Sequence, residues 1–179
     1  GPHEWHFSNL NIIPREIDGV AVIRGIEFNI CPGGALDRMS EKSLEPVEFA
    51  LASFHDCCFA PSTRAAHTEA LEAVLHDKRV QAFGLPGNPK FDFDMEHIIS
   101  QCKLVEINSN SFAIRKGSRE NCTKIARLCK KYQVPIVVDS DSHIEYTVGC
   151  VDNALEMLEE IGFPEELVVN SSRERLDEY

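Results

Sequence analysis

The sequence predicts an α/β fold with a parallel β-sheet, and three observations support this prediction. Short runs of β-branched and aromatic residues alternate with longer segments that have helical periodicity. The alternation repeats about every 25 to 30 residues, which is typical of βα units in a parallel sheet. No run is followed by a glycine-rich nucleotide-binding motif. Successive units of this kind either wind an open sheet or close into a barrel.

Five strands are expected where apolar runs end in a turn signal or a polar side chain. They cover residues 20–26, 49–54, 80–84, 104–107 and 135–138. Helices are expected between and after these strands, at residues 65–77, 94–102, 119–132 and 151–161. In 65–77 and 119–132 the apolar residues recur every three or four positions, as on the buried face of a helix.

The remaining segments give weaker signals. Residues 1–18 are expected to be irregular, with Trp5 and Phe7 anchoring the segment by burial. Residues 35–46 form a polar connection with room for a short helix, and Ser172 is expected to cap a terminal helix. No linker or low-complexity stretch interrupts the chain, so we expect a single domain over residues 1–179.

Composition and charge exclude several classes of function. The formal net charge is −11, which argues against a nucleic-acid partner because phosphate binding favours a basic face. An acidic protein can still bind a phosphorylated small molecule when metal ions supply positive charge locally. The sequence contains no run long and apolar enough for a membrane span and no recognisable signal peptide. The 7 cysteines are irregularly spaced without a Cys-x-x-Cys motif, which indicates reduced thiols and a cytoplasmic protein.

Polar side chains recur at the ends of the predicted strands. The residues at these ends are Glu27, His55, Leu85, Asn108, and the pair Asp141 and His143. In an extended segment Asp141 and His143 would point the same way, so both could bind one ion. Mixed carboxylate and imidazole ligands suit zinc, manganese or iron(II). A hydrogen-bonded Asp/His pair without a metal is the alternative interpretation for this pair.

Other charged residues have candidate roles. His6 precedes the first strand in a segment that could fold over the strand ends, where it would contact a ligand residue or substrate. The loop 115–118 contains Lys116, which is a candidate phosphate contact. The alternative interpretation is that this loop is only solvated. His67, His76 and His97 lie among polar neighbours in helical segments and are expected to be exposed.

These residues occur in an ordered set of motifs that resembles a known superfamily. The set is Pro2-His3-x-Trp5-His6-Phe7, Gly25-Ile26-Glu27, Phe54-His55, Pro86-Gly87-Asn88-Pro89-Lys90, Glu106-Ile107-Asn108, Arg115-Lys116-Gly117-Ser118 and Ser140-Asp141-Ser142-His143. Together they resemble the PHP (polymerase and histidinol phosphatase) superfamily, in particular its YcdX-like metal-dependent phosphatase branch. The resemblance extends over essentially the whole chain.

The resemblance implies a distorted (βα)7 barrel with up to three divalent ions, usually zinc, and phosphoesterase activity on a small phosphomonoester. Glu27 then corresponds to a bridging carboxylate, and His55, Asp141 and His143 to further metal ligands. Glu27, Asp141 and His143 would also form the catalytic centre, in which a metal-activated water attacks phosphorus. The sequence leaves the oligomeric state open.

Two departures from the superfamily pattern support an alternative function. The first one or two βα units, which carry a His-x-His motif, are absent from this chain, and Leu85 stands where the pattern has a histidine. The chain would then be a degenerate, catalytically impaired PHP domain that binds metal or a partner. A metallohydrolase that acts on another bond is a third possibility.

Overall fold

The computed structural model describes residues 4–85 and 87–179 and contains a five-stranded parallel sheet. The strands occur in the spatial order β3-β4-β5-β6-β7, so each is hydrogen-bonded to the next one along the chain. Their bounds are Gly25–Asn29 for β3, Phe49–Ser53 for β4, Ala82–Gly84 for β5, Val105–Asn108 for β6 and Ile136–Asp139 for β7. The predicted α/β class with a parallel sheet is therefore confirmed.

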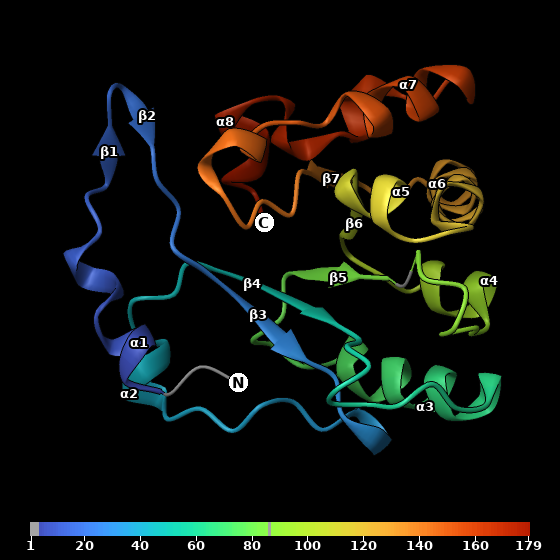
Figure 1. Cartoon of the computed structure of the whole chain (residues 1–179), viewed down its shortest axis with the longest axis horizontal. Coiled ribbons are helices and arrows are strands. Elements are labelled where there is room, and N and C mark those ends of the chain that lie inside the picture. Colours follow the sequence, from blue (N-terminus) through green and yellow to red (C-terminus); the bar gives the residue numbers. More distant parts are fainter. Residues whose placement is uncertain (1–3, 86) are drawn as a thin grey trace.

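Helices follow the strands in the predicted order. Figure 1 shows α3, α4 and α6 one after another along one side of the sheet. The helices that follow β4 along the chain are α3 (Arg64–Leu75), α4 (Met95–Ile99), α5 (Asn110–Ile114), α6 (Ser118–Tyr132), α7 (Asp152–Glu160) and α8 (Arg173–Leu176). The predicted cap of the last helix is present, since the Ser172 side chain accepts a hydrogen bond from the backbone N–H of Arg175.

The main core lies between the sheet and these helices. In β6 the side chains alternate, with Val105 and Ile107 buried while Glu106 and Asn108 are only half-buried. Ile107 packs into the same core as Leu71 of α3 and Ile125 of α6. Burial of each such side chain contributes about 1.5–3 kcal/mol. The alternation places Glu106 and Asn108 on the face of β6 opposite to Val105 and Ile107.

The first predicted strand is wrong in its bounds. Residues 20–26 do not form one strand, because Val20–Ala21 (β2) pairs with Glu16–Ile17 (β1) in a separate hairpin. Asp18 and Gly19 both have positive φ angles, as a two-residue hairpin turn of type I′ requires. Strand β3, at the edge of the sheet, starts only at Gly25 and places Glu27 in its middle rather than beyond its end.

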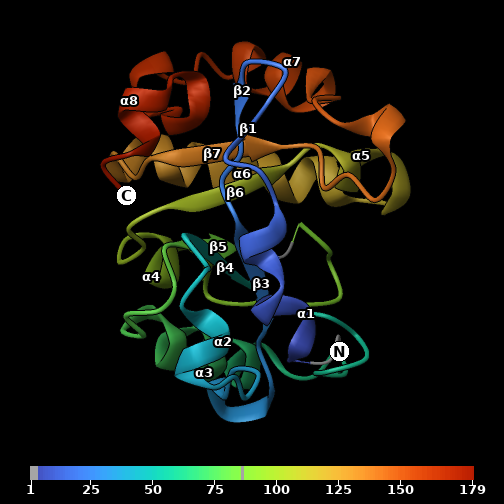
Figure 2. The same cartoon turned by 90° about the vertical axis from the view of Figure 1, so that its left-hand side faces the viewer.

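The N-terminal segment also differs from the prediction. It contains a one-turn helix, α1 (Trp5–Ser8), and a 3-10 turn at Leu10–Ile12, and α2 (Glu41–Leu44) lies in the polar connection. Trp5 is 61% exposed and does not anchor the segment by burial, whereas Phe7 packs against the core. Figure 2 shows this segment crossing in front of the sheet. His3 lies outside the described residues.

His67 is buried, contrary to the prediction that it is exposed. It lies on the face of α3 that also buries Leu71, and its ring packs among Phe54, Phe59 and Phe91. Its Nε2 accepts a hydrogen bond from the Ser62 backbone N–H at 2.9 Å, so Nδ1 carries the proton and donates to the Asp92 carbonyl at 2.8 Å. His67 thereby joins the loop after β4 to the loop after β5.

The expectations for two further histidines and for the cysteines agree with the structure. His76 and His97 are exposed. All seven cysteines are free thiols. Within residues 4–85 and 87–179, no helix has the length and apolar character needed to cross a membrane.

A prediction concerns the start of α3, where the Thr63 hydroxyl accepts a hydrogen bond from the Ala66 backbone N–H. Thr63→Ala removes this cap and is expected to lower the free energy of unfolding by about 1 kcal/mol. The matched control is Thr123→Ala inside α6, where the hydroxyl only bonds back to the Arg119 carbonyl. In this control the higher helix propensity of alanine offsets the lost hydrogen bond, so the free energy of unfolding is expected to change by no more than about 0.5 kcal/mol. Denaturant unfolding measures both, and equal losses would contradict the prediction.

Candidate functional site

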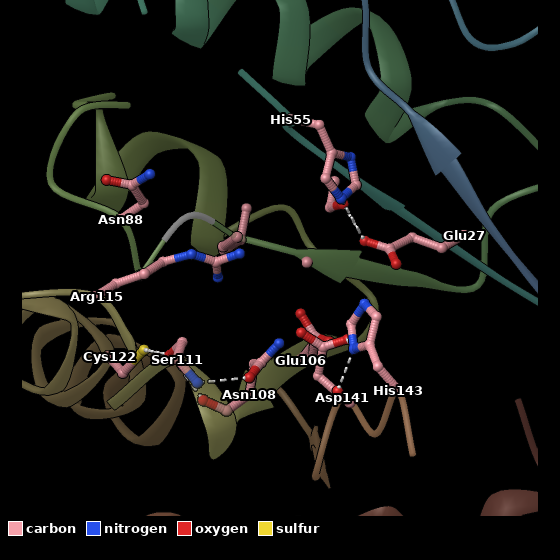
Figure 3. A pocket seen from close by; sticks show the side chains of 14 residues that line it. Glu27, His55, Asn88, Glu106, Asn108, Ser111, Arg115, Cys122, Asp141 and His143 are labelled. Atoms are coloured by element: carbon pink, nitrogen blue, oxygen red, sulfur yellow. Dashed lines mark hydrogen bonds and ion pairs between the residues drawn. The ribbon is translucent and has the colours of Figure 1, made fainter. Parts of the chain in front are cut away.

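A polar pocket of about 160 Å³ lies at the carboxyl ends of the parallel strands. Residues from β3, β4, β5, β6 and the loop after β7 line it (Figure 3), because parallel strands end at the same edge of a sheet. The lining residues are Glu27, Ser53, His55, Gly84, Leu85, Gly87, Asn88, Glu106, Asn108, Ser111, Arg115, Cys122, Asp141 and His143.

Glu27 and His55 form the first carboxylate–imidazole pair of the pocket. Glu27 points from β3 towards the end of β4, where it accepts a hydrogen bond from the Ser53 hydroxyl. The His55 Nε2 lies 3.3 Å from the Glu27 Oε1. The His55 Nδ1 is buried and has no hydrogen-bond partner in the described structure. A buried polar atom without a partner is costly, which marks this imidazole as incompletely satisfied.

Asp141 and His143 form the second pair, with a geometry that differs from the expected extended segment. Strand β7 ends at Asp139, and the Asp139 side chain accepts a hydrogen bond from the Asp141 backbone N–H at 3.2 Å. Asp141 has a φ of 42°, a left-handed conformation uncommon for a residue other than glycine. The turn leaves the His143 Nδ1 3.8 Å from the Asp141 Oδ1.

The protonation of the His143 ring follows from its hydrogen bond. Its Nδ1 lies 2.9 Å from the Asp141 carbonyl oxygen, which can only accept, so Nδ1 carries the proton in the neutral ring. The Nε2 lone pair is then available to a ligand. Because the His143 side chain is 81% exposed, this lone pair is accessible from solvent.

Glu106 and Asp139 are further carboxyl groups that sequence reasoning did not select. Burial, together with the charge and hydrogen bond of Asp139, raises the pKa of Glu106 well above its usual value, and Glu27 and Asp141 add to the effect. Burial also raises the pKa of Asp139, although its hydrogen bonds with Glu106 and with the Asp141 N–H act in the opposite direction. The signal for Glu106 was present, since it alternates with the buried Val105 and Ile107.

The carboxylates and imidazoles of the two pairs suit a divalent cation, but they do not form a complete coordination sphere. In the part of the chain that is described, no three His, Cys, Asp or Glu side chains are placed to hold one ion. The structure assembles two separate pairs, each with one carboxylate and one imidazole. Excess carboxyl groups and an imidazole nitrogen without a partner are features that a bound cation would satisfy.

The opposite end of the pocket contains neither carboxylate–imidazole pair, and Glu106 lies beside it. Asn88, Asn108, Ser111, Arg115 and Cys122 line it. Burial raises the pKa of the Cys122 thiol to about 11; the nearby hydroxyls and the Arg115 charge act against this rise, and the Glu106 charge adds to it. A buried thiol of this kind is a poor nucleophile.

The remaining predicted site residues lie elsewhere. Leu85 is buried and forms part of the pocket wall. His6 is exposed on α1 and Lys116 is exposed beside Arg115, and neither is among the described residues that line the pocket. Their roles in substrate binding, like the ligand roles of Glu27, His55, Asp141 and His143, stay predictions.

Fold and site together define an α/β protein with a polar pocket at the carboxyl edge of a parallel sheet, where proteins of this class carry out catalysis. The chain matches no protein-family model. It is 46% identical to a probable phosphatase of Acetivibrio thermocellus, with 99% of this chain and 76% of that protein covered. A probable phosphatase of Caldicellulosiruptor saccharolyticus is 40% identical, with 97% of this chain and 74% of that protein covered. A probable phosphatase of Clostridium botulinum is 38% identical, with 100% of this chain and 75% of that protein covered. The chain belongs to this family of probable phosphatases.

A prediction follows from the raised pKa of Glu106. In the unfolded chain this carboxyl titrates near pH 4, so folding becomes less favourable as pH rises from there towards the higher folded-state pKa. Each unit of upward shift corresponds to about 1.4 kcal/mol. Glu106→Gln is therefore expected to raise the free energy of unfolding of chelator-treated protein at pH 7 and to have little effect below a pH of about 4.

Denaturant unfolding at several pH values measures this effect. The matched control is Glu156→Gln, which makes the same change at an exposed position of α7 and is expected to have little effect. A Glu106→Gln protein that is less stable than the parent at pH 7, or a difference that does not depend on pH, would contradict the prediction.

Proposed function

We propose that this protein is a metal-dependent phosphoesterase that hydrolyses a small phosphomonoester. The observation that carries the proposal is the meeting of two carboxylate–imidazole pairs, Glu27 with His55 and Asp141 with His143, at the carboxyl edge of the sheet. Membership of a family of probable phosphatases supports the phosphoester as the bond that is cleaved.

In this proposal each pair contributes ligands to a divalent metal centre, most simply zinc, with manganese or iron as alternatives. Glu27 would serve as a ligand of this centre through its carboxylate oxygens. The accessible His143 Nε2 and the Asp141 carboxylate approach from the opposite side of the pocket. A bound divalent ion supplies Lewis-acid chemistry, since it activates water as a nucleophile and offsets negative charge on phosphoryl oxygens.

The protein's own groups would orient these ligands. The Ser53 hydroxyl fixes one oxygen of Glu27, and the Asp141 carbonyl fixes the tautomer of His143. Asp139 holds the turn that presents Asp141. The Glu106 carboxyl, whose pKa is raised, keeps a proton in the pocket at pH values where an exposed glutamate would have lost it.

We propose further that the sheet is the larger part of a distorted barrel of the PHP type. The strand order supports this, because it follows the chain without the reversal that defines a doubly wound sheet. Sequential parallel order is the arrangement in (βα) barrels.

The first test combines turnover with metal content. The purified protein is expected to release phosphate from an aryl phosphate when zinc or manganese is present and to lose this activity with a chelator. Asp141→Asn is expected to lower kcat/KM by at least about 100-fold and to reduce bound metal, because it removes a charged ligand. Absence of metal-dependent turnover would contradict the proposed function.

Asp152→Asn is the matched control for this experiment. Asp152 is exposed at the start of α7 and does not line the pocket. Turnover and metal content are expected to stay near those of the parent. Equal losses in Asp141→Asn and Asp152→Asn would contradict the assignment of Asp141 to the metal centre. Activity on esters or amides in place of phosphomonoesters would favour a different metallohydrolase.

Leu85 favours the second candidate function, a catalytically impaired domain that binds metal or a partner. This buried leucine occupies the end of β5, in the centre of the strand-end row, and it cannot coordinate a metal. If this position limits the metal centre, Leu85→His is expected to increase the bound metal per chain. Leu85→Asn, which is similar in size, is the control for loss of the apolar side chain. Elemental analysis measures both, and unchanged metal content in Leu85→His would contradict an impaired site at this position.

A further inference from the structure

The half of the pocket away from the two carboxylate–imidazole pairs presents hydrogen-bond donors. Asn108 illustrates this, because its Oδ1 accepts a hydrogen bond from the Ser111 backbone N–H at 2.9 Å. A backbone N–H can only donate, so the amide orientation is determined and the NH₂ group is the end that remains. The Nδ2 of Asn108 has no acceptor among the described residues, and Figure 3 shows it directed into the pocket.

Asn88 has the same arrangement on the facing loop. Its Oδ1 accepts a hydrogen bond from the Lys90 backbone N–H at 3.1 Å, which again leaves the NH₂ group without an acceptor in the described part of the chain. Both asparagines therefore use their only acceptor within their own loop. Each side chain therefore presents its NH₂ group as a hydrogen-bond donor to a ligand in the pocket.

Arg115 adds a positive charge between these two amides. It is the one lysine or arginine among the described residues that line the pocket. Its guanidinium extends into the space between Asn88 and Asn108 (Figure 3). Every ion pair of the described chain is formed by other residues, so the guanidinium has no carboxylate partner there. In a chain of net charge −11, a guanidinium at a pocket without a carboxylate partner is available to an external anion.

Close packing holds the two loops in this arrangement. A Cβ atom on Gly87 would lie 2.6 Å from both the Cys122 Sγ and the Ser118 Oγ, so only glycine lets the loop before Asn88 lie against α6. Beneath the pocket, the hydroxyls of Ser111 and Ser118 are hydrogen-bonded at 2.7 Å. The donors are thus presented by a packed surface, which suits recognition of one small group.

We propose that Arg115, Asn88 and Asn108 form a subsite that binds the oxygens of a phosphoryl group. The guanidinium and the two amides contact the phosphoryl oxygens from the side opposite the carboxylate–imidazole pairs. This inference rests on the proposed phosphoesterase function for the identity of the anion. It assigns the binding role in the loop 115–118 to Arg115 rather than to Lys116, which does not line the pocket.

The test measures binding of inorganic phosphate to the zinc-loaded protein by calorimetry. Arg115→Gln removes the charge, and Asn108→Asp keeps the side-chain shape and the acceptor for Ser111 while replacing the donor with a negative oxygen. Each is expected to raise the phosphate Kd by roughly tenfold or more, as for loss of a charged hydrogen bond or addition of a repulsive charge. The competitive inhibition constant for phosphate in turnover is expected to rise by the same factor.

Two matched controls separate a local contact from a change in overall charge. Lys116→Gln makes the same charge change at the adjacent exposed residue, and Asn153→Asp makes the same isosteric change on the exposed face of α7. Both are expected to change the phosphate Kd less than twofold. Circular dichroism and the melting temperature show whether the pocket variants keep the parent fold, which is expected because Arg115 is exposed.

The outcomes distinguish this inference from the proposed function. Weakened phosphate binding in Arg115→Gln and Asn108→Asp alone supports the subsite, even when no phosphomonoester is hydrolysed. Metal-dependent turnover with unchanged phosphate binding in both variants overturns the subsite and leaves the proposed function in place. No saturable phosphate binding by the parent protein at millimolar concentration, or equal effects of Arg115→Gln and Lys116→Gln, also overturns it.

Discussion

Repulsion among carboxyl groups at one edge of the sheet is the constraint that the rest of the site depends on. Parallel strands in sequential order bring Glu27, Glu106, Asp139 and Asp141 to the same edge. Folding therefore concentrates negative charge that an antiparallel arrangement would have divided between two edges. The chain reduces this repulsion locally, through the raised pKa of Glu106 and its hydrogen bond with Asp139.

This charge distribution gives the pocket two chemically distinct ends. One end contains carboxylates and imidazoles, which accept cations or protons. The other contains amide and guanidinium donors, with their acceptor atoms used inside their own loops. A group that carries negative oxygens fits between a cation and such donors, whereas a neutral apolar molecule would leave both ends unsatisfied. The polarity of the pocket thus matches the class of substrate inferred for the family.

Much of this architecture could be predicted from the sequence, because periodicity reports burial directly. The segment 49–54 and the helical spacing of 65–77 predicted β4 and α3 to within a residue or two. Glu27 and His55 could be placed near each other because they belong to consecutive parallel strands, although Glu27 lies in the middle of β3 and not at its end. His67 was missed although it shares a helical face with Leu71, since its polar neighbours obscured the spacing.

The remaining errors come from backbone geometry that residue types do not specify. The turn at Asp18 and Gly19 diverts Val20 into a hairpin, although its β-branched side chain is typical of a central strand. Asp141 and His143 are neighbours because of a left-handed turn rather than through alternation in a strand. Arg115 and Lys116 are adjacent and both basic, so the sequence does not distinguish their roles. Only the three-dimensional arrangement shows that Arg115 lines the pocket.

The buried imidazole of His67 has a consequence for how this protein can evolve. It connects Ser62, which follows His55 along the chain, to Asp92, which follows Asn88, and it uses both ring nitrogens to do so. The Asn88 carbonyl is in turn bonded by the N–H of Phe91, whose ring packs on His67. The two walls of the pocket are therefore mechanically one unit. Natural variation on either wall should accordingly be correlated with variation on the other, so that substrate preference diverges through paired substitutions.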